Sequence, residues 1–290
     1  MNKKITFYHC HTPLHIGSGT TLDIIDLPIQ REAHTNFPVM PSTAIKGVIR
    51  AEYGLEESDF SLDDFPEKPE ACPETVNQDK CEEFFNLFGY GDKEGDIIFT
   101  DGKILLFPVK SVKGVFVWIT CPLLLERLER DTGIKINFDK ENLRNKGAIV
   151  SSEEPVINNQ YLVLEELSFE VSIDNDLKNS FDKLGLDIDT KKIAVLPNDS
   201  FRYFVKNHTE VNARTRIDQT TGTVKEGALW YEELVPAETV FYNLIFSRTE
   251  NSKNIEKITN FMDNKIFQFG GDETLGRGFT KVSILEGKNE

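Results

Sequence analysis

The hydrophobic pattern of the chain changes repeatedly between the period of a strand and the period of a helix. Residues 3 to 10 alternate polar and apolar side chains, which predicts a first strand, and further strands are expected at 113–121 and 161–173. Helical spacing of apolar residues, with turn or capping residues at the ends, predicts five helices over 42–53, 82–89, 122–133, 175–185 and 251–264.

Antiparallel hairpins are expected at 96–109, around Asp101-Gly102, and between 265–271 and 276–285. Residues 200–218 and 228–247 are predicted as strands on either side of QTTGTVKEG, which would form a long, partly solvated β-arm. Because strands and helices are interspersed, we expect an α+β fold rather than a doubly wound parallel sheet. The 290 residues allow one large domain or two small ones.

The most informative stretch is a long loop at 17–40 followed by the helix beginning PSTAIKGVIR. Loops of this length are often functional. Ser42 is predicted to cap the helix, and its free N–H groups could receive an anion. Lys46 and Arg50 are four residues apart and therefore share a helix face. This stretch and GGDETLGRGF at 270–279 together suggest a phosphate-bearing ligand beside an acid.

Charge is distributed unevenly along the chain. The net charge is −15, which by itself disfavours nucleic acid as a partner. Residues 52–96, however, hold 15 Asp and Glu against 3 Lys, so one acidic block accounts for most of the excess. Residues 200–225 carry a net charge of +3, and 41–50 contain two basic residues and no acid. Either basic patch alone could be an ordinary solvated face.

Cysteine usage and hydropathy indicate a cytoplasmic protein. No apolar run approaches eighteen residues, and the N-terminal residues lack the apolar core of a signal peptide. Cys10, Cys72, Cys81 and Cys121 are scattered, so free thiols are expected, with a Cys72–Cys81 pair as the alternative. His9 and His11 point away from Cys10 on a strand and are expected to be ordinary strand residues.

Several segments together resemble the RAMP superfamily of CRISPR proteins, from end to end of the chain. They are HTPLHIGSG, DLPIQRE, PSTAIKGVIR, LFG, TEVNARTRIDQTTGTVKEGALWYEELVP and GGDETLGRGF. The combination is most similar to the repeated backbone subunit of the Cmr complex, the type III-B effector. The resemblance implies one RAMP domain over 1–290 with an RRM-like (ferredoxin-like) core. It also implies a protruding β-hairpin thumb at about 205–234. Residues 55–80 are acidic and contain prolines, and they are expected to form a poorly ordered insertion in this domain.

The same resemblance implies the activity and the partners. Copies of the subunit would stack along a CRISPR guide RNA, beside other Cmr complex subunits and away from any membrane. Each thumb would displace a guide nucleotide, and complementary target RNA would be cut at regular intervals with a divalent metal, Mg²⁺ or Mn²⁺. The family's cleavage residue precedes LPIQRE and is Asp26 here. It could hold the metal or accept the 2′-hydroxyl proton, whereas the alternative is a carboxylate that caps a turn.

Three further acidic or basic residues are weighed as cleavage residues. His15 could lie beside the scissile phosphate or be a hydrogen-bonded structural histidine. Asp23 could be a second metal ligand, although a solvated position is favoured. Glu226 follows the thumb, next to Lys225, and could reach the cut site of a neighbouring copy.

Guide binding is expected at three places. Ser42, Thr43, Lys46 and Arg50 would hold phosphates without reading bases. Arg214 and Arg216 lie on the predicted thumb. The glycine loop would let the backbone pass close to RNA, through Gly270, Gly271, Gly276, Arg277 and Gly278. A dinucleotide-binding role is rejected because that motif should follow the first strand of a βαβ unit. No role is assigned to Trp230 or Tyr231.

Two alternatives to a target nuclease are considered. One is a scaffold in which Asp26 is silent and another subunit cuts. The other is a guide-processing ribonuclease of the same superfamily that acts alone and without metal. The intact Asp26 favours the nuclease, and the long thumb and the acidic block disfavour guide processing.

Overall fold

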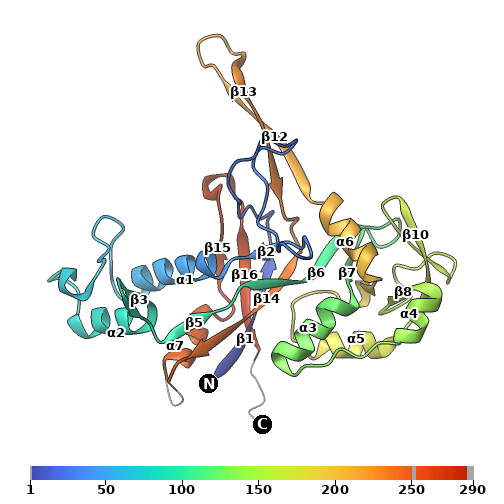
Figure 1. Ribbon diagram of the computed structural model, residues 1–290, viewed down its shortest axis with the longest axis horizontal. Helices are drawn as coiled ribbons and strands as arrows, with labels where there is room; N and C mark the ends of the chain where they lie inside the picture. The colour runs from blue at the N-terminus through green and yellow to red at the C-terminus, as the bar shows by residue number, and fades with distance from the viewer. Residues whose placement is uncertain (1, 250–252, 286–290) are drawn as a thin grey trace.

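A single mixed sheet organises the computed structural model, which describes residues 2–249 and 253–285 (Figure 1). Its main path runs through ten strands. In spatial order they are β15 (Ile266–Gln268), β16 (Phe279–Leu285), β1 (Lys3–Cys10), β14 (Val240–Ser247), β6 (Gly102–Lys110), β7 (Phe116–Thr120), β11 (Ile193–Val195), β8 (Gly147–Val150), β10 (Leu167–Ile173) and β9 (Tyr161–Leu164). Two more strands, β2 (Val39–Met40) and β5 (Ile97–Phe99), pair with β6 and β14. The predicted α+β class is confirmed.

The first strand, β1, is buried on both faces. It lies between β14 and β16 and is antiparallel to each. Ile5 and Phe7 join one hydrophobic core, whereas Tyr8 and Cys10 join the other. The alternation expected for 3–10 is therefore present, but both of its faces are covered. Helices α1 (Ser42–Glu56), α2 (Gln78–Phe88) and α7 (Asn254–Met262) contribute to the core that contains Tyr8.

The other half of the sheet carries helices that were only partly predicted. Helices α3 (Pro122–Thr132) and α5 (Asn175–Asp182) follow the expected ranges. Helix α4 (Lys140–Lys146) and strands β8 and β11 were missed because each is seven residues or shorter. The expected strand at 200–218 is wrong in its first part, because α6 (Asn198–Asn207) occupies it. Phe201, Phe204 and Val205 form the buried face of that helix.

The hairpin expected around Asp101-Gly102 is also wrong. Strands β5 and β6 do not pair with each other; both pair with β14, one after the other along its length. The Asp101 side chain explains the difference, since its carboxylate accepts a hydrogen bond from the Ser42 N–H at 2.7 Å. The Asp-Gly segment therefore meets the start of α1 instead of turning the chain back.

The acidic insertion is packed and not the loose segment that was expected. The Phe60 and Phe65 rings lie edge-on to Phe84 of α2, at 5.0 and 5.6 Å between ring centres. A short 3-10 helix, η1 (Pro69–Ala71), leads to Cys72, which forms a disulfide with Cys81 of α2. Four free thiols were expected, which is wrong for this pair. Strands β3 (Gly89–Tyr90) and β4 (Lys93–Glu94) form a small hairpin after α2.

The predicted thumb is a two-stranded ribbon that projects from the body (Figure 1). Strands β12 (Glu210–Ile217) and β13 (Val224–Leu234) pair with each other and belong to no larger sheet. Two further 3-10 helices, η2 (Thr190–Lys192) and η3 (Glu273–Leu275), lie in connections. Within the described residues, none of the helices is long and apolar enough to cross a membrane.

Candidate active site and nucleic-acid interface

Asp26 lies at the root of the thumb, on the long loop between β1 and α1. One carboxylate oxygen, Oδ2, accepts a hydrogen bond from the Tyr231 N–H of β13 at 2.8 Å. In the part of the chain that the structure describes, Oδ1 of Asp26 makes no hydrogen bond. The residue is half-buried. The carboxylate is thus held by one oxygen while the other stays available to a ligand.

Backbone pairing fixes the loop against the thumb root. The Leu27 N–H donates to the Tyr231 carbonyl, and the Glu233 N–H donates to the Leu27 carbonyl. Just after β13 ends, Leu14 and Val235 exchange both of their backbone hydrogen bonds. Three segments distant in sequence therefore meet along β13, which sequence reasoning could not show because none of these pairings is local.

His15 is placed in the same junction but is buried. The residue is 8% exposed, and its Nδ1 lies 2.7 Å from the Glu233 carbonyl oxygen. A carbonyl only accepts, so Nδ1 carries a proton. Nε2 is 3.7 Å from Glu232 Oε1. These contacts favour the structural alternative for His15.

Arg214 also faces inward. Its guanidinium donates to Glu232 at 2.8 Å and to both carboxylate oxygens of Asp272 at 2.7 and 2.8 Å. The Asp272 and Glu232 hydrogen bonds raise the Arg214 pKa above its ordinary value. The guanidinium also lies over the Trp230 ring, 5.6 Å from its centre, which gives Trp230 a packing role. Arg214 therefore joins the thumb to the glycine loop.

The glycine loop approaches protein backbone closely. Gly270 has a φ of +80°, and a Cβ there would lie 2.1 Å from the His15 carbonyl oxygen. Gly278 has a φ of +74°, and a Cβ there would meet the Phe269 carbonyl oxygen at 1.9 Å. Gly271 and Gly278 donate their N–H groups to the carbonyls of His15 and Pro13. These glycines thus pack closely against the chain's own backbone, at Pro13 and His15 of the N-terminal segment and at Phe269.

Four other residues at or near the thumb were predicted to contact RNA or to take part in cleavage: Gly276, Arg216, Arg277 and Glu226. Gly276, with a φ of +73°, has open space around it. Arg216 is exposed on β12, and Arg277 is half-buried close to Glu210, whose pKa is raised by burial and lowered in part by Arg277. The Glu226 side chain lies outside the part of the chain that the structure describes.

A cluster of positive charge lies on α1. Lys46 is half-buried, and its pKa is lowered by desolvation and by repulsion from Arg50 and Arg248. Among the described residues, Lys46 makes no ion pair or side-chain hydrogen bond. Arg50 lies over the Phe65 and Phe84 rings, 5.2 and 4.9 Å from their centres, and burial lowers its pKa.

The start of α1 differs from the prediction in one respect. Pro41 occupies the cap position and Ser42 is the first residue of the helix, so Ser42 is not the cap. Its N–H already donates to Asp101, as described above. Thr43 is exposed on the first turn. Arg248, which follows β14 and pairs with Glu94, was missed by sequence reasoning because it comes from a distant part of the chain.

The described residues contain one cluster of side chains that could hold a metal ion. One group of three ligand atoms within 4.8 Å of one another comes from Glu165, Glu166 and His208, and it does not include Asp26. Asp23 is exposed, and its Oδ1 accepts from the Ile24 N–H. The protein therefore offers a cation at Asp26 a single carboxylate oxygen. Such a site suits a hard ion that completes its shell with water and phosphate oxygens, as Mg²⁺ does.

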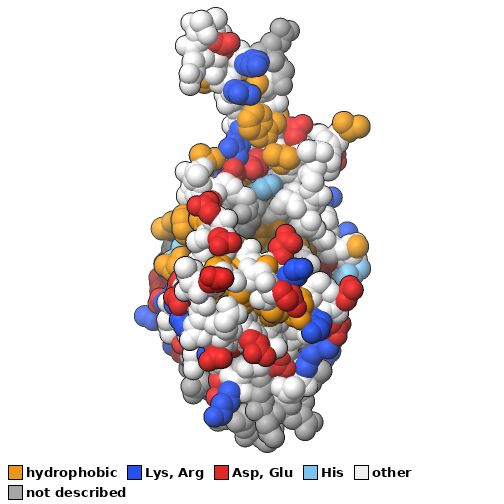
Figure 2. Space-filling model, turned by 90° about the vertical axis from the view of Figure 1, so that its left-hand side faces the viewer, with side chains coloured by type: hydrophobic (Ala, Val, Ile, Leu, Met, Phe, Trp, Pro, Cys, Tyr) orange, Lys and Arg blue, Asp and Glu red, His pale blue; other side chains and the backbone are white. Residues whose placement is uncertain are grey.

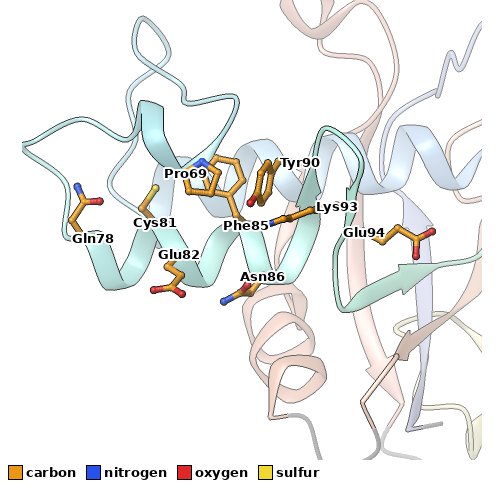
Figure 3. Close-up of a pocket in the computed structure, with 9 residues that line it drawn as sticks. All are labelled: Pro69, Gln78, Cys81, Glu82, Phe85, Asn86, Tyr90, Lys93 and Glu94. Atoms are coloured by element: carbon orange, nitrogen blue, oxygen red, sulfur yellow. The ribbon is translucent and has the colours of Figure 1, made fainter.

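A pocket of 380 Å³ lies between α2 and the β3–β4 hairpin, beside the acidic insertion and away from the thumb root (Figure 3). Its lining includes Glu82, Phe85, Tyr90, Lys93 and Glu94. Figure 2, viewed from the side of α2, shows acidic and basic side chains interspersed over the body, and Lys and Arg beside hydrophobic side chains on the thumb. The features expected for RNA are thus at the thumb root and on α1, and not at this pocket.

The fold and the charged residues at the root of the thumb define a class of protein. The sequence of residues 7–281 matches the family model of the RAMP superfamily. The chain belongs to the RAMP superfamily, as its resemblance to that family had indicated.

Individual relatives narrow the comparison. The chain is 38% identical to the CRISPR system Cmr endoribonuclease Cmr4 of Pyrococcus furiosus, over 96% of this chain and 94% of that protein. It is 23% identical to the CRISPR system CMR subunit Cmr4 of Saccharolobus solfataricus, over 97% of this chain and 96% of that one.

Solved structures show the same similarity at the level of the fold. The crystal structure of oligomeric Cmr4 from Pyrococcus furiosus matches with a TM-score of 0.73, at 30% identity, over 99% of each chain. A chain of the type III-B Cmr-beta structure bound to cognate target RNA matches with a TM-score of 0.74, over 98% of this chain and 97% of that one. At 20% identity, this second likeness shows a shared fold.

Proposed function

We propose that the chain is a CRISPR RNA-binding backbone subunit of a type III-B effector complex and an endoribonuclease that cuts complementary target RNA at regular intervals. Its likeness to the Pyrococcus furiosus endoribonuclease, at 38% identity over nearly the full length of both chains, supports this. The observation that carries the proposal is the Asp26 carboxylate, which is anchored by Oδ2 at the thumb root and has Oδ1 unpaired among the described residues.

RNA brings its own nucleophile, the 2′-hydroxyl, so the protein has to place the phosphate and assist proton transfer. Asp26 is suited to accept the hydroxyl proton through Oδ1. Alternatively, Oδ1 would hold Mg²⁺ or Mn²⁺, which when bound would neutralise charge that develops on the phosphate. Tyr231 fixes the carboxylate by donating to its other oxygen. His15 and Glu226 remain proposed participants, although the burial of His15 favours a supporting role.

Guide binding is proposed for the cationic cluster of α1. Lys46 has no carboxylate partner among the described residues, and its pKa is lowered by burial and by two nearby guanidinium groups. A phosphate would relieve that repulsion without any contact to a base, which suits a guide of arbitrary sequence. Ser42, Thr43 and Arg50 would lie beside the same phosphates, and Arg216 and Gly276 would meet RNA at the thumb.

An RRM-like core is also part of the proposal. The order of β1, α1, β6, β14, α7 and β16 along the chain gives two βαβ units, and each unit's strands enclose one strand of the other. Such split βαβ units characterise ferredoxin-like folds. In this description, residues 111–234 and the acidic block are insertions into one domain.

The test is a cleavage assay on the assembled complex with complementary RNA. Asp26→Asn keeps an acceptor oxygen for Tyr231 but removes the charge, so cutting should be abolished while guide binding survives in a gel shift. EDTA should stop cutting by the unaltered complex, and Mg²⁺ or Mn²⁺ should restore it. Normal cutting by Asp26→Asn would leave the chain as a guide-binding scaffold. Cutting that persists in EDTA would remove the metal from the proposal.

A further inference from the structure

The segment that carries Asp26 has little support of its own. Leu22 and Ile24, just before it, are 108% and 86% exposed and thus lack core contacts. Apart from its own bond to Tyr231, Asp26 is held against the thumb root by the segment that follows, 27–31, which pairs with β13 through Leu27. Whatever fixes that segment to the thumb root therefore sets the position of the carboxylate.

Glu233 of β13 collects the contacts that fix this segment. Its side chain is only 5% exposed. The Ile29 N–H donates to Oε2 at 3.1 Å, and Arg31 Nη2 donates to Oε1 at 2.5 Å. The Thr209 hydroxyl, next to the first residue of β12, donates to Oε1 at 2.7 Å.

The backbone of Glu233 adds two more contacts. Its N–H donates to the Leu27 carbonyl at 3.0 Å, and its carbonyl accepts from His15 Nδ1 at 2.7 Å. One residue therefore contacts the Asp26 loop, the segment after β1 and the start of the thumb. It lies two residues from Tyr231, the donor to Asp26.

The negative charge of Glu233 is what these contacts require. All three partners of its side chain are donors, and an ionised carboxylate is a pure acceptor. Arg31 Nη1 donates to the carbonyls of Asn36 and Val205, at 2.8 and 2.9 Å. Because these bonds fix the guanidinium, it cannot easily move to a partner other than Glu233. An amide at position 233 would turn an N–H₂ group towards at least one of these donors, which leaves buried polar groups unsatisfied.

We infer that Glu233 is a positioning residue for cleavage: through Ile29 and Arg31 it fixes the Asp26 loop to the thumb root. This inference rests on the proposed function, because it assumes that Asp26 acts on the RNA. It gives the thumb a second role. Besides setting the spacing of the cuts in the target RNA, the thumb holds the cleavage loop of its own copy. Since a displacement of about 1 Å can cost on the order of 100-fold in rate, loosening the loop should slow the chemical step strongly.

The experiment compares Glu233→Gln with the unaltered chain in the assembled complex. Single-turnover cutting should fall on the order of 10- to 100-fold, while the Kd for target RNA and the cut positions stay the same. Hydrogen exchange on the full chain should show faster exchange in 27–31 and at the Tyr231 amide, which reports directly on its bond to Asp26. Unchanged exchange there, or a cutting rate within 2-fold of normal, would overturn the inference.

A matched control separates positioning from general destabilisation. Asp131 of α3 is likewise a largely buried carboxylate with three donors, Lys103, Arg130 and Tyr242, and it lies on a different element from the thumb. Asp131→Asn should lower the Tm without changing the cutting rate or the exchange of 27–31. If Asp131→Asn slows cutting as strongly as Glu233→Gln, the effect is one of stability and the inference fails.

A milder variant covers the case in which Glu233→Gln does not fold. Thr209→Val keeps the side-chain shape and removes only one donor to Oε1. It should change cutting and exchange in the same direction, by a smaller factor, and no change in either would overturn the inference. The two proposals fail differently: if Asp26→Asn still cuts, the proposed function fails, whereas if only Glu233→Gln and Thr209→Val behave normally, this inference fails alone.

Discussion

Lys46 holds a positive charge that none of the described carboxylates neutralises. Burial and two neighbouring guanidinium groups lower its pKa, so the protonated form is disfavoured in the free protein relative to an exposed lysine. A bound phosphate would favour that form and bring the pKa back up. The charge is lost as pH rises through the lowered pKa, so guide affinity should weaken at a lower pH than an ordinary lysine would give.

We predict that Lys46→Ala weakens guide binding equally for guides of unrelated sequence. Each phosphate contact that is lost should make the slope of log K against log salt shallower by about 0.7 for single-stranded RNA, once per copy on the guide. Filter binding across a salt series measures this. Lys257→Ala is the matched control, because the Lys257 ammonium is already paired with Glu83. Equal slopes for both variants would assign Lys46 to an ordinary solvated face.

The three basic residues of the α1 cluster were not equally predictable from the sequence. Lys46 and Arg50 could be placed together because a spacing of four on a helix is local information. Arg248 joins them only through the pairing of β14 with β5. Likewise, Asp26 was identified by resemblance, whereas its donor Tyr231 depends on a long-range contact that no local pattern encodes.

At the scale of elements, the thumb is a ribbon with two different faces. The side chains of Val211, Leu229 and Tyr231 are exposed apolar groups, and the register places them on one face, whereas Ile217 and Val224, also exposed, pair with each other beyond a register shift near the tip. Arg214 and Trp230 share the other. At its tip the Asp218 carboxylate accepts from the N–H groups of Thr220 and Thr221, which closes the turn without any core.

We predict that the tip shapes the RNA and does not supply the chemistry. Replacing 218–223 with a short Gly-Ser turn should suppress cutting at every regular position, although Asp26 stays anchored. The reason is that unstacking a base costs a few kcal/mol, which the tip would offset by packing between bases. Mapping the cut sites on a sequencing gel measures this.

The control for the tip is another polar turn. Asn158 and Asn159, both at positive φ, form the turn between Ile157 and Tyr161, and replacing them with Gly-Gly should leave cutting unchanged. Regular cuts at the normal rate in the tip variant would show that residues 218–223 do not determine the scissile geometry.

Elements were predictable from the sequence where their stabilising contacts are local. Helix α3 has Pro122 at its start and Gly133 in the left-handed conformation at its end, and both were recognised. Helix α6 was missed because its aromatic residues suggested a strand, although Phe201, Phe204 and Val205 also fit a helical period. The hairpin at 96–109 failed because Asp101 binds α1, a contact with a distant segment.

At the scale of the whole molecule, the exposed apolar face of the thumb offers a surface for contact between the proposed copies. Such a face on a projecting ribbon, together with the proposed stacking of copies, leads us to predict that Leu229→Lys weakens assembly along the guide. Light scattering in the presence of guide RNA should show smaller assemblies, while the Tm stays close to normal since Leu229 is 53% exposed.

Leu62→Lys provides the comparison, because Leu62 is 82% exposed on the acidic insertion and off the thumb. It should leave assembly unchanged. Assemblies of normal size with Leu229→Lys would exclude the apolar face as a contact between copies.

The position of β1 between β14 and β16 has a consequence for how the protein is made. Roughly 230 residues separate the end of β1 from the start of β14. At about 5–20 residues per second, a ribosome needs on the order of ten seconds or more to deliver the first of its two neighbours. During that time β1, apolar on both faces, has no strand to pair with, so nascent chains should depend on chaperones until translation passes β16.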